Sequence, residues 1–312
     1  MNDKLDLLLR QLGSVIFGKE RECRLTVCAL LAGGDLLIED VPGVGKTTLA
    51  MALAQSLDLS FGRIQFTPDT LPGDITGYST IDLRTGELRF HEGPVMHNIV
   101  LADEINRTSP KTQASLLEVM AERQVTAEGR TMPLPRPFMV IATENPIEFA
   151  GTYHLPEAQL DRFMMRISMG YPSAEEELNM LRDRLTGSEQ AALKPVLTGP
   201  EVLELQRAAE AVRMTEKILH YIVRIVAETR QNKSLTLGAS PRATIALARC
   251  ARAWALLEGR DFVTPQDVQA VIPSVLTHRL MLSLESGMQA ITAAEVLQDC
   301  VKRVAAPPVL RT

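Results

Sequence analysis

The residues with the clearest chemistry lie at positions 36–48, where an apolar run leads into a loop rich in proline and glycine and then into a helical pattern. Glycine allows backbone N–H groups to close around a polyphosphate, and the N-terminus of the following helix points its partial positive charge at that anion. Lys46 is placed to reach the β- and γ-phosphates, and the hydroxyl of Thr47 to bind Mg²⁺. The spacing predicts a nucleotide-binding loop; the alternative is a glycine-rich turn with a chance lysine.

One position of this loop departs from the general pattern G-x-x-x-x-G-K-[ST], because Asp40 stands where the first glycine belongs. Aspartate tolerates a left-handed backbone better than most residues, but its carboxylate has to point away from bound phosphates. We expect the departure to affect nucleotide affinity more than nucleotide binding itself. The predicted phosphate-binding residues are Pro42, Gly43, Val44, Gly45, Lys46, Thr47 and Thr48.

Two acids, Asp103 and Glu104, follow the apolar run 99–102. In an open parallel sheet, ligands bind beyond the carboxyl ends of the strands, which is where these acids are expected. Asp103 is predicted to hold the Mg²⁺ shell, and Glu104 to orient or deprotonate the attacking water. The alternative, a strand that simply runs into a polar loop, is weakened by the phosphate loop upstream.

Three further residues are candidates for the same site. Asn145 follows the apolar run 138–142 and could hydrogen-bond the γ-phosphate or position its water, although Asn-Pro is also a common way to open a loop. Arg162 is a candidate arginine finger, a cation that stabilises charge on the transferring phosphoryl group. Arg166 is its rival, and for either residue an ion-paired or solvated arginine is the plainer alternative.

Arg242 lies in the first turn of a helix that Ser240 and Pro241 are predicted to start. That end of a helix repels cations by roughly 0.3–1 kcal/mol. An arginine there is better explained if an anion lies nearby, and the alternative is an exposed side chain that curls back to an acid.

Five short apolar runs predict buried parallel strands. Helical stretches alternate with them, one after the phosphate loop and one from an N-cap at Ser109 followed by Pro110. This alternation implies an α/β fold with a parallel sheet covered on both faces. Two insertions read as β-hairpins, either surface ribbons or binding loops. The predicted strands are the run before the phosphate loop, 63–67, 99–102, 138–142 and 165–169, and the predicted hairpins are 76–94 and 124–135, turning at 84–87 and around 128–129.

After residue 173 the strands are expected to stop, and helices follow one another with starts at Gly199-Pro200, Ser240-Pro241 and Thr264-Pro265. A chain of 312 residues exceeds what one core usually supports. We therefore predict a nucleotide-binding α/β core over 1–172 and a helical domain over 173–312.

Composition limits the partners and the compartment. Asp and Glu number 38 against 33 Lys and Arg, a net charge of −5, and this balance argues against a dedicated nucleic-acid surface. No apolar run approaches the roughly 18 residues of a membrane span, and the N-terminal segment is acidic where a signal peptide is basic. The cysteines lack the paired spacing of a zinc site, so reduced thiols in a cytoplasmic protein are expected. They are Cys23, Cys28, Cys250 and Cys300.

In this order, these segments resemble the MoxR branch of the AAA+ ATPases over nearly the whole chain. The resemblance implies a P-loop αβα core, an all-α lid, and a ring, usually a hexamer, with ATP and Mg²⁺ at the subunit interfaces. By position, Asn145 looks like sensor 1 and Arg242 like sensor 2. Arg162 looks like the finger that reaches a neighbour's site, while Ile16 and Gly18 match the segment that lines the adenine pocket. The segments that carry the resemblance are 15–19, 38–47, 101–107, 110–113, 142–146, 155–163 and 239–242.

The resemblance also implies a function. MoxR-like proteins resemble chaperones that mature or activate client proteins, often metalloenzymes, alongside partners with von Willebrand factor A domains. The two hairpins match insertions that face the ring pore in related machines. The lid arginine and the neighbour's finger are expected to share the γ-phosphate, so that hydrolysis to ADP lets lid and neighbour relax.

Three alternatives stay open at this stage. A regulatory module would bind ATP and assemble with little turnover, although the presence of both Asp103 and Glu104 argues against it. A magnesium-chelatase-like motor subunit would drive metal insertion with partner subunits. A nucleic-acid motor would use arginines in or beside the hairpins to line a pore, namely Arg84, Arg89, Arg123 and Arg130.

Overall fold

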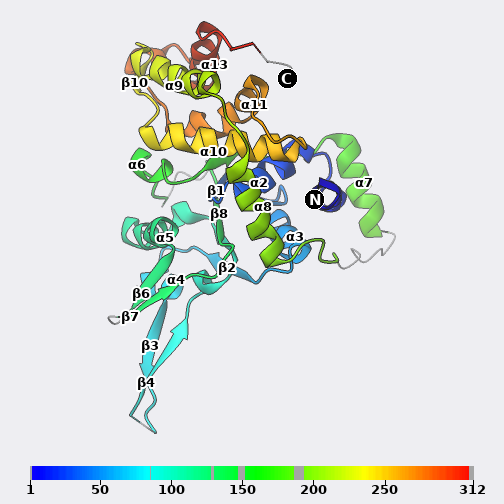
Figure 1. Ribbon diagram of the computed structural model, residues 1–312. Helices are drawn as coiled ribbons and strands as arrows, with labels where there is room; N and C mark the ends of the chain where they lie inside the picture. The colour runs from blue at the N-terminus through cyan, green and yellow to red at the C-terminus, as the bar shows by residue number, and fades with distance from the viewer. Residues whose placement is uncertain (1, 85, 128–129, 147–151, 186–192, 309–312) are drawn as a thin grey trace.

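A five-stranded, fully parallel β-sheet forms the centre of the first part of the chain (Figure 1). The computed structural model describes residues 2–84, 86–127, 130–146, 152–185 and 193–308. The strand order across the sheet is β2-β5-β8-β1-β9, which confirms the predicted sheet, although β2 begins and ends earlier than the predicted run. The strands are β1 (Leu36–Glu39), β2 (Phe61–Gln65), β5 (Ile99–Asp103), β8 (Met139–Glu144) and β9 (Met165–Ile167).

The central strands are apolar up to their carboxyl ends because both faces of the sheet are covered. Side chains alternate between the faces along each strand. Ile38 packs into a hydrophobic cluster with α1, α2 and α3 that continues into the later helices, whereas its neighbour Leu37 packs into a second cluster with α5. The core helices are α1 (Asn2–Val15), α2 (Glu20–Leu31), α3 (Lys46–Ser56), α4 (Pro72–Thr76), α5 (Pro110–Glu122) and α6 (Glu157–Leu160), with 3₁₀ turns η1 (Pro94–Met96) and η2 (Ile105–Arg107).

Both predicted hairpins are present. The first pairs β3 (Gly77–Ile81) with β4 (Leu88–Glu92), and the second pairs β6 (Gln124–Ala127) with β7 (Arg130–Pro133). Figure 1 shows that β3-β4 extends far from the sheet. The predicted turn at 128–129 and residue 85 of the other turn lie outside the described residues.

The rest of the chain is mainly helical, as predicted, and the helix starts after Thr198, Ser240 and Thr264 are confirmed. The strands do not stop completely, because β10 (Leu235–Leu237) pairs with β11 (Met281–Leu282) in a short antiparallel ladder. The boundary at residue 173 stays a prediction. The helices are α7 (Ala174–Leu185), α8 (Gly199–Ala211), α9 (Glu216–Gln231), α10 (Pro241–Leu257), α11 (Pro265–Leu276), η3 (Thr277–Arg279), α12 (Leu284–Met288) and α13 (Ala293–Arg303).

The lid packs directly on the core through α10, which contacts α2, α8, α9 and α11. The cysteines are free and buried, as expected. Within the described ranges, none of the helices combines the length and the apolar character that crossing a bilayer requires.

Candidate nucleotide-binding site

The topology of the sheet brings the predicted site residues to one edge. β8 lies between β5 and β1, so the carboxyl ends of these three strands are neighbours. Ala102 of β5 pairs with Ala142 of β8, and Glu39 of β1 pairs with Glu144 of β8. The segments that follow are the acidic pair, Asn145 and the phosphate loop, which therefore meet beyond the strand ends, where ligands bind in open parallel sheets.

The phosphate loop has the backbone conformation that its glycines permit. Gly43 and Gly45 have φ values of +86° and +93°, in the left-handed region that side chains disfavour. Gly45 is also the N-cap of α3, and its side-chain-free backbone leaves the first N–H groups of α3 facing the loop. At Gly43 a Cβ atom would meet nothing within 4 Å, so the backbone conformation and not the available space requires glycine there.

Lys46 lies inside this loop. Its Nζ donates to the backbone carbonyl of Asp40 at 2.7 Å and to that of Glu144 at 3.4 Å, and the residue is 8% exposed. Burial lowers the pKa of Lys46, and the carboxylates of Asp40, Asp103 and Glu104 oppose that shift. The ammonium is therefore held between the ends of β1 and β8 by neutral carbonyls, which a phosphate oxygen can replace.

The carboxylate of Asp40 points away from the loop interior, as expected. Its Oδ2 accepts hydrogen bonds from the backbone N–H groups of Met169 and Gly170, both at 2.6 Å, and from Ser168 Oγ at 3.0 Å. Burial favours a higher pKa for Asp40, but these bonds and one from Val41 outweigh it and lower the pKa. Asp40 therefore fastens the phosphate loop to the segment that follows β9.

The acidic pair is held by a hydroxyl on the neighbouring strand. Thr143 Oγ1 donates to Asp103 Oδ1 at 2.8 Å and accepts from the backbone N–H of Glu104 at 2.9 Å. Glu104 has a φ of +58°, a left-handed conformation that is uncommon for a residue with a side chain. Such outliers cluster at functional sites, and this one turns the chain at the point where β5 ends.

Three residues that sequence reasoning missed contact the two acids. Arg63 Nη2 pairs with Asp103 Oδ2 at 2.7 Å. Gln65 Nε2 donates to Glu104 Oε2 at 3.0 Å, and Arg107 Nε lies 3.2 Å from the same oxygen. Gln65 ends β2 and pairs in register with Asp103 on the adjacent strand, a relationship that depends on the strand order and that the sequence did not signal.

Asn145 follows β8 directly and is 3% exposed. Its backbone carbonyl accepts a hydrogen bond from Asn106 Nδ2 at 3.2 Å. On the other side of the loop, the side chain of Ile16 approaches Gly45, where a Cβ atom would lie 3.9 Å from Ile16 Cδ1. Gly18 has a φ of +68°, a conformation that favours glycine, and the carboxylate end of the Glu176 side chain lies against it.

The residues present suit Mg²⁺, which prefers hard oxygen ligands and keeps several waters when it is bound with nucleotide phosphates. Thr47 and Asp103 offer a hydroxyl and a carboxylate at the phosphate loop and at the adjacent strand end. In the described part of the chain, no cluster of three or more His, Cys, Asp or Glu side chains could hold a metal ion by itself. This donor set fits a metal shared with a nucleotide better than a metal held by protein alone.

The two candidate cations lie elsewhere. Arg162 and Arg242 line a common pocket of about 410 Å³, together with Asp35 and Met164. Asp35 directly precedes β1 and Met164 directly precedes β9, so this pocket is at the amino-terminal edge of the sheet. The length of β1 alone separates the two edges by roughly 13 Å. Both arginines are exposed, and Arg162 Nη1 donates to the carbonyl of Leu117 at 2.7 Å.

The expectation that Arg242 reaches the phosphate loop of its own chain is therefore not met. The first turns of α10 line this pocket, at the sheet edge opposite the loop. Arg166, the rival of Arg162, is paired with Glu39 at 2.5 Å within its own chain, and the choice of Arg162 as the finger stays a prediction. The structure brings Arg162 and Arg242 together, and both apart from Lys46.

Arg123, one of the arginines that the nucleic-acid alternative places at a pore, is engaged within its own chain. Its guanidinium makes a bidentate pair with the buried carboxylate of Asp35, at 2.8 and 3.1 Å, and stacks over the ring of Phe138. Arg84, Arg89 and Arg130 are exposed on the hairpins. Arg123 is thus part of the wall between the hairpin and the arginine-lined pocket.

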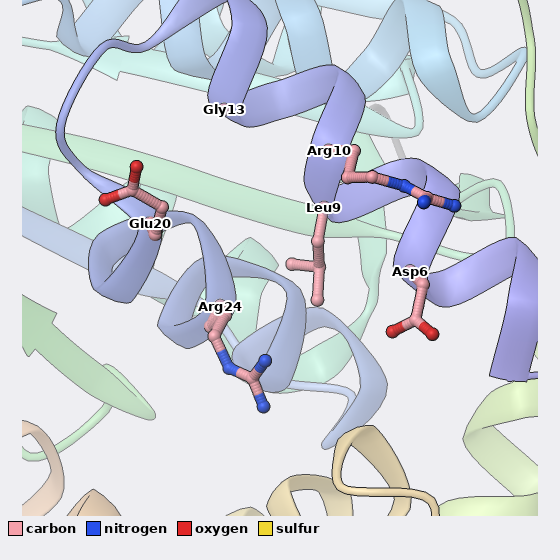
Figure 2. Close-up of a pocket in the computed structure, with 6 residues that line it drawn as sticks. All are labelled: Asp6, Leu9, Arg10, Gly13, Glu20 and Arg24. Carbon is pink, nitrogen blue, oxygen red and sulfur yellow. The ribbon is translucent and has the colours of Figure 1, made fainter.

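A larger groove of about 530 Å³ lies between α1 and α2 and contains none of the predicted site residues. Figure 2 shows Leu9 of α1 pointing toward α2, the helix that carries Glu20 and Arg24. The guanidinium of Arg24 is already engaged, because it pairs with Glu258 and stacks over the ring of Trp254.

The sheet, the phosphate loop, the acidic pair and the lid define a nucleotide-binding protein of the AAA ATPase class. Two family models match accordingly, "ATPase family associated with various cellular activities (AAA)" over residues 35–165 and "AAA lid domain" over residues 227–300.

Relatives specify the family. The chain is 41% identical to Chaperone MoxR1 of Mycobacterium tuberculosis, over 98% of this chain and 83% of that one. It is 49% identical to the uncharacterized protein YeaC of Bacillus subtilis, over 96% and 93% of the two chains. The crystal structure of a proposed ATPase from Cytophaga hutchinsonii superposes with a TM-score of 0.92 at 36% sequence identity. The superposition covers 98% of this chain and 96% of that one. The chain belongs to the MoxR family of AAA+ ATPases.

Proposed function

We propose that this protein hydrolyses ATP, and the observation that carries the proposal is the meeting of Lys46, Asp103, Glu104 and Asn145 at adjacent strand ends. Lys46 and the N-terminus of α3 bind the phosphates. Mg²⁺, held through Thr47 and Asp103, would neutralise charge on the β- and γ-phosphates. Glu104 orients or deprotonates the attacking water, and Asn145 positions that water or the γ-phosphate.

The arginines act on the nucleotide of another copy. Arg162 and Arg242 share a pocket at the sheet edge opposite their own phosphate loop, so a γ-phosphate that they contact belongs to a neighbour. The loop edge of one copy and the arginine edge of the next are different and complementary surfaces. Contacts of this head-to-tail kind generate closed rings when the rotation closes. A ring, with six copies as the family resemblance implies, therefore completes each site at a subunit interface.

The work done by hydrolysis is remodelling of client proteins. A relative of this chain bears the name chaperone, and the β3-β4 hairpin extends from the core with exposed apolar side chains, including Ile81, Leu83 and Leu88. Loss of the γ-phosphate removes the ligand shared by loop and arginines, and this differential contact moves one copy against the next. Clients that include metalloenzymes, a partner with a von Willebrand factor A domain, and a cytoplasmic location belong to the same proposal.

Mixing variants tests the shared site. Lys46→Ala removes phosphate binding but leaves both arginines. Arg242→Ala leaves phosphate binding but removes one of the arginines. Each variant alone is expected to lose turnover, since a cation supplied by a neighbouring chain contributes about 10³–10⁵ in rate in other nucleotide hydrolases. An equimolar mixture recovers turnover at interfaces that combine an intact loop with an intact arginine. Full turnover by a strictly monomeric protein contradicts the proposal.

Client remodelling needs its own test. Glu104→Gln is expected to bind ATP without hydrolysing it and to hold clients that the wild type releases. Proteins recovered from native cells with Glu104→Gln and ATP should exceed those recovered with the Lys46→Ala control. Equal recovery from both variants counts against remodelling.

One observation favours a regulatory module as the second candidate. Glu104 is bound by both Gln65 and Arg107, so its carboxylate is engaged by the protein itself. A protein that keeps this arrangement in the assembled state would bind ATP with little turnover. Absence of turnover at concentrations where rings form supports this candidate over the enzyme.

A further inference from the structure

Asp161 is the residue at which the core, the lid and both candidate cations meet. It directly precedes Arg162 in the chain, at the end of α6. Its two carboxylate oxygens each accept from Ser240 Oγ at 3.0 Å. The same Ser240 hydroxyl accepts from the backbone N–H of Ala243 at 3.1 Å and so caps α10. Arg242 lies in that first turn, so one carboxylate fixes the chain at Arg162 and the helix start at Arg242.

A buried arginine from the lid holds Asp161 in place. Arg279 has a side chain that is 2% exposed, and its Nε donates to Asp161 Oδ1 at 2.9 Å. The remaining guanidinium nitrogens donate to the carbonyls of Asp161, Phe163 and Met164, at 3.2, 2.6 and 3.4 Å. Lid residue Arg279 thus binds backbone carbonyls on both sides of Arg162.

The ion pair of Arg279 with Asp161 is enough to attach the lid to the core, and the bond from Ser240 is an additional interaction. A guanidinium buried to this degree needs a countercharge, and Asp161 supplies it. However, the bond from Ser240 adds nothing to that pairing. Its effect is to tie the first turn of α10 to the residue beside Arg162.

We propose that Asp161, held by Arg279 and bonded to Ser240, is the positioning residue that sets Arg162 and Arg242 as one preassembled pair for a terminal phosphate. The inference rests on the proposed function, in which that phosphate belongs to the nucleotide of a neighbouring copy. The lid and the segment that carries Arg162 then move as one body. Neither Arg162 nor Arg242 therefore has to be ordered separately when a neighbouring copy binds. Asp161 acts through the arginines and touches no phosphate.

The test is Asp161→Asn, which keeps the size of the side chain and an acceptor oxygen but removes the charge. Turnover per site is expected to fall about 10²-fold, the loss that a slight misplacement of a catalytic group produces. Affinity for ATP is expected to stay unchanged, because the phosphate loop of the same chain is intact. An equimolar mixture with Lys46→Ala should regain turnover at about a quarter of the interfaces of a randomly mixed ring. A general folding defect would give no such regain.

A matched control lies in the same lid. Asp267 pairs with Arg260, caps α11 and has a side chain that is 2% exposed, but it lies outside the arginine-lined pocket. Asp267→Asn should lower the melting temperature at least as much as Asp161→Asn does and leave turnover unchanged. An equal loss of turnover in the control overturns the proposal, because lid stability would then explain both results.

A second pair of variants covers the case in which Asp161→Asn does not fold. Ser240→Ala leaves the pair of Arg279 and Asp161 intact and removes the bridge to α10 together with the N-cap bond to Ala243, whereas Ser240→Thr keeps a hydroxyl for both. Turnover should fall with alanine and return with threonine, with ATP affinity constant in both. Normal turnover in Asp161→Asn and Ser240→Ala, with an active wild type, overturns this inference alone. A wild type that assembles without hydrolysing ATP overturns the proposed function instead.

Discussion

The guanidinium of Arg63 lies 2.7 Å from one carboxylate oxygen of Asp103, while the hydroxyl of Thr143 binds the other oxygen at 2.8 Å. Asp103 is the acid that we assign to Mg²⁺, and a protein cation therefore holds the carboxylate that the metal needs. The side chain of Arg63 is 47% exposed, so solvent screens the pair and it can open at low cost.

Arg63→Ala is therefore expected to lower the Mg²⁺ concentration that gives half-maximal ATP turnover. An exposed ion pair contributes about 0.2–1 kcal/mol, which corresponds to roughly a 1.5- to 5-fold change. The measurement is a Mg²⁺ titration of turnover at saturating ATP. Arg89→Ala, on the distant hairpin, is the control. A requirement for more Mg²⁺ in Arg63→Ala would show that Arg63 supports the metal site instead of competing with it.

Glu104→Gln is expected to reduce turnover by about 10²–10⁴, the usual contribution of a positioned general base, with little change in ATP affinity. Glutamine can still accept from Gln65 and Arg107, so the shape of the site is kept. Single-turnover kinetics and equilibrium binding separate the two effects. Weakened binding with unchanged single-turnover rate would assign Glu104 to the nucleotide and not to the water.

Asp40→Ala leaves the backbone N–H groups of Met169 and Gly170 without their acceptor, and each unsatisfied donor costs about 1–3 kcal/mol. We expect a loss in the free energy of unfolding and weaker ATP binding, since the phosphate loop loses its attachment. Asp69→Ala, an exposed acid near the end of β2, is the control. Because the pKa of Asp40 is lowered on folding, its stabilisation is complete above the unfolded pKa and disappears as pH falls through the folded value. The difference between the two variants in urea should therefore shrink below about pH 4.

Glu144 gives the opposite pH dependence. Burial, with help from the charge on Glu39 and against that on Arg166, raises the pKa of Glu144 from 4.5 to about 7. Its Oε1 is buried without a hydrogen-bond partner. The native state therefore binds a proton that the unfolded chain releases, and stability falls as pH rises from 4.5 to 7, by at most about 3 kcal/mol.

Glu144→Gln should remove this loss. Its melting temperature is expected to exceed that of the wild type at pH 8 by more than it does at pH 5. Glu157→Gln, an exposed acid of α6, is the control and should show no such divergence. A constant difference across this pH range would mean that Glu144 is ionised at both ends of it.

Much of the site followed from local sequence. Gly43, Gly45 and Lys46 identify a phosphate loop because glycines at this spacing, followed by lysine at the start of a helix, are typical of phosphate-binding loops. The acidic pair and Asn145 could be placed because each follows a short apolar run, and parallel strands end at the same edge. Contacts across strands were beyond reach, since the partners Gln65, Arg63 and Thr143 depend on the strand order.

Sequence by itself determined which elements form and which strand ends carry chemistry, because glycine conformation, helix caps and apolar runs act over a few neighbouring residues. Only the tertiary structure decided on which side of the sheet the lid lies. The docking of α10 depends on contacts between segments far apart in the chain, such as Arg279 with Asp161. That docking puts Arg242 beside Arg162 and across the sheet from Lys46, a relationship that no local pattern contains.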